Sequence, residues 1–168
     1  MAEGLVIRPV TGADAAAIAD IYNHYIRQTV VTFEEVELTA QDMAGRISAT
    51  TATYPWLVGE VEGAIIGYAY ASRYQERSAY RYSAVSSIYL DHRQCGKGHG
   101  LPLYAAMLDQ LPARGIHTVL GVITVPNPAS MALHATLGFQ KVGHTREVGF
   151  KLGRWIDVAY VQRMLDTP

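Results

Sequence analysis

The chain has 168 residues, of which 49% are hydrophobic and 17% charged, and its formal net charge is −1. This composition predicts one compact domain over residues 1–168, and the lack of lysine or arginine runs argues against a nucleic-acid partner. The sequence contains no stretch of about 18 uninterrupted apolar residues that could span a bilayer, so we expect no membrane partner. The N-terminal sequence has no basic segment followed by a long apolar one, and the single Cys95 cannot form an internal disulfide. We therefore expect a cytoplasmic protein.

The first third of the chain predicts a strand and two helices. Residues 5–10 read as a short strand, and Thr11 with Asp14 predicts the start of a helix with apolar positions every three or four residues. A second helix is predicted from Thr39 to about residue 52. Phe33 lies in the connection between the helices, where packing is the usual role of an aromatic residue and a lid over a substrate pocket the less common one.

Residues 54–90 predict antiparallel strands. The segments 56–58 and 64–70 flank a hairpin turn at Gly63, and a strand over residues 80–90 follows a turn at residues 75–78.

The stretch S-S-I-Y-L-D-H-R-Q-C-G-K-G-H-G-L-P-L-Y, residues 86–104, changes from a strand period to a helical one. Gly96, Gly98 and Gly100 therefore lie in a strand-to-helix turn, before a helix predicted from about residue 98 to 110. Such a turn suits phosphate oxygens, because it combines close backbone approach with unpaired N–H groups and the helix dipole. The spacing fits neither G-x-x-x-x-G-K-[ST] nor G-x-G-x-x-G, so a pyrophosphate of another cofactor or a tight turn without a ligand remains.

The last third predicts a buried strand over residues 118–124 and a helix that begins at Asn127-Pro128 and stops at Gly138. A terminal hairpin around Gly153 completes the chain. The order of elements predicts an α/β or α+β domain with a mixed sheet.

Several segments together resemble a known family. The glycine turn and N-P-A-S-M-A-L-H-A-T-L-G-F from Asn127 resemble the GNAT superfamily of acyl-CoA N-acyltransferases. Within it, I-Y-N-H-Y-I from Ile21, Y-P-W-L-V from Tyr54, P-N-P-A-S-x-x-L-H from Pro126 and G-x-W-x-D-V from Gly153 resemble phosphinothricin and methionine sulfone or sulfoximine N-acetyltransferases. The resemblance implies a mostly antiparallel sheet with a splayed strand pair and about four flanking helices. It also implies acetyl-CoA as cofactor, no metal, a small-molecule amine as substrate, and a homodimer.

The resemblance assigns cofactor binding to one strand, the glycine turn and the start of a later helix. The strand would pair with the pantetheine arm, and the turn would hold the pyrophosphate. The residues concerned are Ile88, Tyr89, Leu90, Gly96, Lys97, Gly98, His99, Gly100, Leu101, Asn127 and Ser130. Asn127 is equally expected as a plain helix N-cap.

The resemblance also implies catalytic and substrate-binding residues. Asn127 would lie near the thiol end of the cofactor, and His134 stands where many members place a tyrosine that acts as general acid; a structural histidine is the alternative. The substrate side would include Phe33, Tyr74, Gln75, Glu76, Arg77, Tyr80, Val85 and Val158. Arg77 suits an anionic phosphinate or carboxylate, although a solvated turn charge is equally expected, and Tyr80 would lie beside it at the start of the strand.

Two residues depart from the family pattern. Val85 stands where the family has the glutamate proposed as general base, which leaves His134 as the best remaining base. Cys95 replaces the arginine or glutamine that usually opens the phosphate turn. Because of this replacement, we expect weaker cofactor binding.

These features favour an acetyl-CoA-dependent N-acetyltransferase. An acyl-CoA-binding sensor or scaffold without catalysis is the alternative, and acetylation of a protein N-terminus or lysine is a third possibility.

Overall fold

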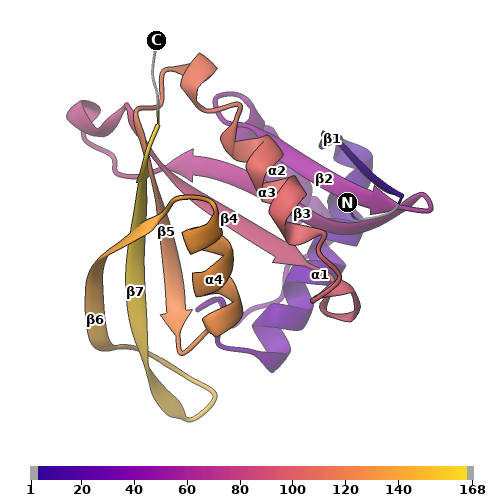
Figure 1. The fold of residues 1–168 in the computed structure, drawn as a ribbon. Coiled ribbons are helices and arrows are strands. Elements are labelled where there is room, and N and C mark those ends of the chain that lie inside the picture. The colour runs from indigo at the N-terminus through magenta and orange to yellow at the C-terminus, as the bar shows by residue number, and fades with distance from the viewer. Residues whose placement is uncertain (1–3, 166–168) are drawn as a thin grey trace.

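The computed structural model describes residues 4–165. Its centre is a seven-stranded sheet with the order β1-β2-β3-β4-β5-β7-β6 (Figure 1). The strands are β1 (Leu5–Pro9), β2 (Trp56–Val61), β3 (Ala64–Arg73), β4 (Ser83–Leu90), β5 (Thr118–Val125), β6 (Gln140–Lys151) and β7 (Arg154–Met164). The helices are α1 (Ala15–Gln28), α2 (Ala40–Thr51), α3 (Gly100–Leu108) and α4 (Pro128–Thr136). The predicted mixed fold is confirmed.

Helices cover both faces of the sheet (Figure 1). Helices α1 and α2 pack on one face, where Ile18 and Met43 meet Trp56 in one core cluster. Helix α3 packs on the other face with Leu57 and Ala84, and residues of α4 join the same cluster. Because successive strand residues point to opposite faces, the central strands β2, β3 and β4 contribute side chains to both cores.

All neighbouring strands are antiparallel except β4 and β5. A parallel pair needs a crossover connection, which here contains α3. The crossover starts from the glycine turn, so the turn lies directly beside the end of β4.

The capping signal predicted at Thr39 is confirmed. The Thr39 hydroxyl accepts a hydrogen bond from the Asp42 backbone N–H at 3.1 Å, and Asp42 accepts one in return from the Thr39 N–H at 2.9 Å. This reciprocal pair satisfies N–H groups that the first turn of α2 leaves unpaired.

Two predicted boundaries differ from the structure. Tyr80 does not start a strand, because residues 78–80 form a 3-10 turn in which the Tyr80 N–H donates to the Arg77 carbonyl at 3.0 Å. Helix α3 begins at Gly100 rather than near Gly98, because Gly98 has a left-handed backbone with φ of 83°. Within residues 4–165, no helix is long and apolar enough to cross a membrane.

Candidate active site

The two parallel strands β4 and β5 separate soon after they begin. They pair only at Ser83 with Thr118, at the next residue of each strand, and at Val85 with Leu120. Strand β4 nevertheless stays paired with β3 as far as Leu90. Among the described residues, no strand therefore pairs with the other edge of β4 beyond Val85. Such an edge can bind an extended ligand through its backbone N–H and C=O groups. The predicted splayed strand pair is confirmed.

A cavity of about 420 Å³ lies beside this free edge. We call it the outer cavity. It is lined by Tyr25, Val31, Ile88, Tyr89, Leu90, Cys95, Gly96, Gly98, Gly100, Leu101, Asn127, Ala129, Ser130 and Leu133. The structure thus brings together all predicted cofactor residues except Lys97 and His99.

The glycine turn forms one end of the outer cavity. Gly96 and Gly98 have φ of 78° and 83°, a backbone conformation that favours glycine, and a side chain at either position would meet nothing within 4 Å. The glycines are therefore required by backbone conformation, and the space beside them is open. The free N–H groups of the first turn of α3 follow directly, so this end of the cavity suits an anion.

Two residues of the turn point elsewhere. Lys97 donates from Nζ to the Gln94 side chain at 3.0 Å and lines a separate hollow formed with α3 and β1. His99 is only 6% exposed, and its Nδ1 has no hydrogen-bond partner among the described residues. Neither side chain lines the outer cavity, so both remain predictions as cofactor residues.

Cys95 lies at the edge of the outer cavity and is exposed. Its sulfur is 3.8 Å from the Tyr25 hydroxyl and 3.7 Å from the Asp91 carbonyl oxygen. Tyr25 in turn donates to the Leu90 carbonyl at 2.6 Å, which ties α1 to the end of β4. Burial raises the pKa of Tyr25 above its usual value, so this donor keeps its proton.

Asn127 is the N-cap of α4, as predicted. Its side-chain oxygen accepts from the Ser130 N–H at 3.1 Å, while the amide nitrogen has no hydrogen-bond partner among the described residues. Asn127 also lines the outer cavity, so the N-cap role leaves a donor available for a ligand.

A smaller cavity of about 50 Å³ adjoins the outer one at the strand split. We call it the inner cavity. It shares Val31, Ile88, Tyr89, Asn127 and Ser130 with the outer cavity and adds Ser86, Ser87, Val122, Ile123, Thr124 and His134. A ligand that extends along β4 from the glycine turn therefore ends here.

His134 is 5% exposed in the wall of the inner cavity. Its Nδ1 lies 2.7 Å from the Ser130 carbonyl oxygen, and its Nε2 lies 3.1 Å from the Tyr104 hydroxyl. Since a carbonyl only accepts, Nδ1 carries the proton of the neutral ring and Nε2 accepts from Tyr104. Burial lowers the pKa of His134, partly offset by the bond to Ser130. His134 is therefore a neutral, fully hydrogen-bonded ring.

Gly121 of β5 makes room for this ring. A Cβ atom at Gly121 would lie 2.8 Å from His134 Nε2 and 2.9 Å from Val161 Cγ2. Sequence reasoning missed Gly121, Ser86 and Tyr104 as residues around the site. The signal for Gly121 was its place within a β-branched strand, where glycine often marks the close approach of another group.

The predicted general-base position lacks an acid. Val85 is partly buried and pairs with Leu120, which is the last pair before β4 and β5 separate. It lines neither the outer nor the inner cavity. Val158, the other valine predicted on the substrate side, is only 3% exposed and offers little surface to a ligand.

The Phe33 side chain packs against the terminal hairpin of β6 and β7. A Cβ atom at Gly149 would be 2.3 Å from Cζ of Phe33, so the ring occupies the space left by this glycine. The buried Lys151 also donates from Nζ to the Thr32 carbonyl at 2.7 Å, and burial lowers the pKa of this lysine. The connection between α1 and α2 is therefore held against β6, while Phe33 remains 40% exposed.

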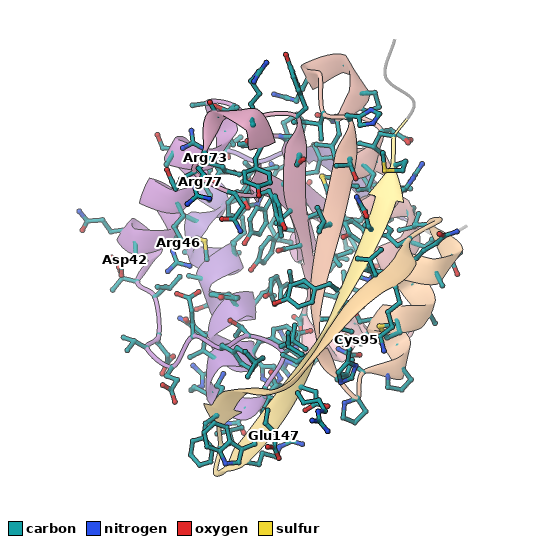
Figure 2. All side chains as sticks on the ribbon, turned by 90° about the vertical axis from the view of Figure 1, so that its left-hand side faces the viewer. Asp42, Arg46, Arg73, Arg77, Cys95 and Glu147 are labelled. Atoms are coloured by element: carbon teal, nitrogen blue, oxygen red, sulfur yellow. The ribbon has the colours of Figure 1, made fainter. Side chains whose placement is uncertain are left out.

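The turn between β3 and β4 contains the other predicted substrate residues. Tyr74 and Tyr80 pack edge to face at 5.4 Å, and Glu76 pairs with Arg73 at 3.1 Å. Gln75 and Arg77 are exposed, and Arg77 has no side-chain partner among the described residues. Figure 2 shows Arg73 and Arg77 well separated from Cys95 across the molecule. None of the five predicted residues of this turn lines the outer or the inner cavity.

Known proteins share this architecture. Residues 7–160 match the model of the acetyltransferase (GNAT) domain. The chain is 41% identical over 162 residues to a phosphinothricin N-acetyltransferase of Streptomyces viridochromogenes, which covers 96% of this chain and 88% of that protein. It is 33% identical to an L-methionine sulfoximine/L-methionine sulfone acetyltransferase of Salmonella typhimurium, over 96% of this chain and 95% of that one.

A solved structure matches as well. A GNAT superfamily phosphinothricin acetyltransferase from Sinorhizobium meliloti, in complex with acetyl-CoA, gives a TM-score of 0.93 at 40% identity over 96% of this chain and 89% of that one. The split sheet, the two joined cavities and these matches define an acyl-CoA-dependent transferase. The chain belongs to the GNAT acetyltransferase family, and its cofactor is acetyl-CoA.

Proposed function

We propose that this enzyme transfers the acetyl group of acetyl-CoA directly to the amine of a small amino acid or analogue. The substrate class is that of phosphinothricin, methionine sulfone and methionine sulfoximine. The observation that carries the proposal is the pair of adjoining cavities, with lining residues in common, between the glycine turn and the strand split. The names of the relatives support the substrate class.

The residues present fit acetyl-CoA. The open turn at Gly96 and Gly98, with the N-terminus of α3, would bind the pyrophosphate, and the free edge at residues 88–90 would pair with the pantetheine amides. The unpaired amide of Asn127 would bind near the thioester. Acetyl-CoA supplies the activated acetyl group, and the protein aligns the amine with it, which is a large part of catalysis in such reactions.

Arg77 is proposed to bind the acidic group of the substrate. Its guanidinium is exposed and has no carboxylate partner among the described residues, so its donors are available. Tyr74, Tyr80, Gln75 and Glu76 would form the surroundings of this group. Phe33 would border the amine side from the connection between α1 and α2.

Thiol release tests the proposed function. The protein is mixed with acetyl-CoA and separately with methionine sulfone, methionine sulfoximine, phosphinothricin and common amino acids, while free thiol is followed. We expect release above the blank with at least one of the first three amines. Release that stays at the blank for the whole panel would count against the proposal.

The alternative function is an acyl-CoA-binding sensor or scaffold without catalysis. Val85 favours it, because a hydrocarbon side chain at this position accepts no proton. It predicts acetyl-CoA binding by calorimetry with no turnover, whereas turnover that His134→Ala abolishes would exclude it. A Val85→Glu variant that gains a large rate on phosphinothricin would show that the rest of the pocket is competent.

Other aspects of the protein are also proposed. The whole chain acts as one N-acetyltransferase domain, in line with the family match over residues 7–160, and the cytoplasmic location stays a prediction. A homodimer is supported by exposed apolar side chains on the β6–β7 hairpin, which include Phe150 and Trp155 at 56% and 61% exposure. Sedimentation equilibrium tests this, and a mass of one chain at micromolar concentration would contradict it.

A further inference from the structure

A chain of buried hydrogen bonds connects β4 to α4 behind the inner cavity. The Ser86 hydroxyl lies 2.6 Å from the Tyr104 hydroxyl, which lies 3.1 Å from His134 Nε2. Ser86, Tyr104 and His134 are 4%, 0% and 5% exposed. Buried polar groups of this kind interact strongly because little water competes with them.

The geometry prevents His134 from acting directly on a substrate. Both of its ring nitrogens are hydrogen-bonded to protein groups, Nδ1 to the Ser130 carbonyl and Nε2 to Tyr104. Phe139 packs edge to face on the ring at 5.0 Å. Both His134 and Ser86, the residue after Val85, line the inner cavity. The one ring nitrogen that can take up a proton, Nε2, is already bonded to Tyr104, so the hydrogen-bonded route from the cavity to His134 runs through Ser86 and Tyr104.

The chain can run in two directions. In one, Ser86 donates to Tyr104 and Tyr104 donates to the free lone pair of His134 Nε2. In the other, a protonated His134 donates to Tyr104, Tyr104 donates to Ser86, and Ser86 donates to the Leu120 carbonyl, which lies 3.4 Å away. Burial raises the pKa of Tyr104 and lowers that of His134, so the first direction describes the resting protein.

We propose that Ser86 exchanges a proton with the reacting groups and that Tyr104 and His134 are positioning residues that act through it. This inference rests on the proposed acetyl transfer and supplies the proton acceptor that Val85 cannot be. A carbon–nitrogen bond forms and a carbon–sulfur bond breaks, so one proton leaves the amine nitrogen and one is taken up by sulfur. Ser86 Oγ accepts the first proton, its own proton passes to Tyr104, and the Tyr104 proton passes to His134 Nε2. The reverse transfers return one proton through Ser86 Oγ to the sulfur.

The first test does not depend on activity. Nitrogen-15 NMR of the ligand-free protein should show His134 as a single tautomer, with the proton on Nδ1 and an unprotonated, hydrogen-bonded Nε2. In Tyr104→Phe, the Nε2 signal should shift because its donor is removed, while Tyr54→Phe, another tyrosine of the same core, should leave it unchanged. A wild-type ring with its proton on Nε2, or no shift in Tyr104→Phe, would overturn the proposal.

The second test is kinetic. We expect Ser86→Ala and Tyr104→Phe each to lower kcat by about 100-fold, the lower end of the usual contribution of proton transfer. KM for acetyl-CoA should stay within about threefold, and the double variant should be no slower than the worse single one, because the residues act as a unit. Tyr54→Phe is the control for a lost tyrosine hydroxyl.

The kinetic outcomes distinguish a failure of the proposed proton chain from a failure of the proposed acetyl transfer. Tyr104→Phe with wild-type kcat, or single effects that multiply in the double variant, would overturn the chain while acetyl transfer stands. A wild-type protein that releases no thiol with any amine would overturn acetyl transfer and with it the exchange at Ser86. Calorimetry of acetyl-CoA binding by each variant shows that a lost rate is not a lost fold.

Discussion

Gly121 illustrates how one backbone position depends on a side chain of another element. The His134 ring lies close against the strand only because position 121 has no Cβ atom. Substitution here forces the ring or Val161 to move.

We expect Gly121→Ala to lower the free energy of unfolding by about 1–3 kcal/mol, the usual cost of overpacking a core. Urea unfolding measures it. Gly45→Ala is the matched control, because Gly45 lies in α2 with nothing within 4 Å of the added atom. That control should gain about 0.5–1 kcal/mol from helix propensity. Equal stability of Gly121→Ala and the wild type would contradict the contact with His134.

Asp14 should make stability depend on acid pH. Its carboxylate accepts two hydrogen bonds from Arg8, each at 2.8 Å, and one from the Thr11 N–H at 2.7 Å. The Arg8 hydrogen bonds, more than Thr11, lower the pKa of Asp14 from 3.8 to about 2. Because the folded pKa lies below the unfolded one, the stabilisation is complete above pH 3.8 and is lost as the pH falls towards 2.

Asp14→Asn removes this dependence. The stability difference between wild type and variant should shrink by about 2 kcal/mol as the pH falls through this window. Urea titrations at several acid pH values measure the difference. A difference that stays constant would show that the pairing with Arg8 does not favour the ionised carboxylate.

Some site residues were accessible to sequence reasoning and others were not. The caps at Thr39 and Asn127 depend on partners three residues away, so the local sequence contains the signal. The bonds of Tyr104 to Ser86 and to His134 join residues 18 and 30 positions apart. Only the packing of α3 and α4 on the same face brings them together.

Among the elements, the glycine turn links backbone conformation to binding. Gly98 and Gly63 have similar left-handed backbones, with φ of 83° and 77°, and a Cβ atom added at either residue would have no neighbour within 4 Å. Only Gly98 lines the outer cavity.

Gly98→Ala and Gly63→Ala should therefore lose similar stability, about 1–2 kcal/mol each, from the unfavourable backbone conformation. Only Gly98→Ala should weaken acetyl-CoA binding, by about tenfold, which corresponds to roughly 1.4 kcal/mol. Calorimetry and urea unfolding measure the two effects. Unchanged affinity in Gly98→Ala would place the pyrophosphate elsewhere.

The element boundaries show where sequence patterns are limited. Tyr80 and Tyr82 are residues that favour a strand, but hydrogen bonds between residues three apart form a turn at residues 77–81 instead. The splayed pair was expected only from the family resemblance. The sequence periodicity of β4 and β5 does not predict that their pairing stops after Val85, because both strands continue with residues that suit a sheet.

For the whole molecule, ligand binding should couple to stability. Two half-sheets are joined by a short parallel pairing, and the cofactor would fill the gap between them. Acetyl-CoA at about 100 times its Kd should stabilise the fold by about 2.7 kcal/mol. Differential scanning fluorimetry should show Tm rising by several degrees with acetyl-CoA and by less with pantetheine, which lacks the pyrophosphate. Equal shifts with both ligands would contradict binding at the glycine turn.

The overall architecture was predictable because its signals are local and consistent. The hairpin signal at Gly63 between β2 and β3, the helical periodicity in α1 and the β-α-β crossover each indicate the same mixed sheet. The position of the residues proposed to bind substrate was not predictable, because Phe33 and the turn near Arg77 come from loops whose placement depends on distant contacts, such as the one between Phe33 and Gly149.

The lone thiol of Cys95 has a practical consequence. It is exposed and borders the outer cavity, and the sequence contains no other cysteine to compete for reagent. A maleimide dye would thus label each molecule once, at the edge of the outer cavity. The slowing of that labelling as acetyl-CoA is titrated would report occupancy of the outer cavity directly, because the acylated sulfur of acetyl-CoA does not react with maleimide.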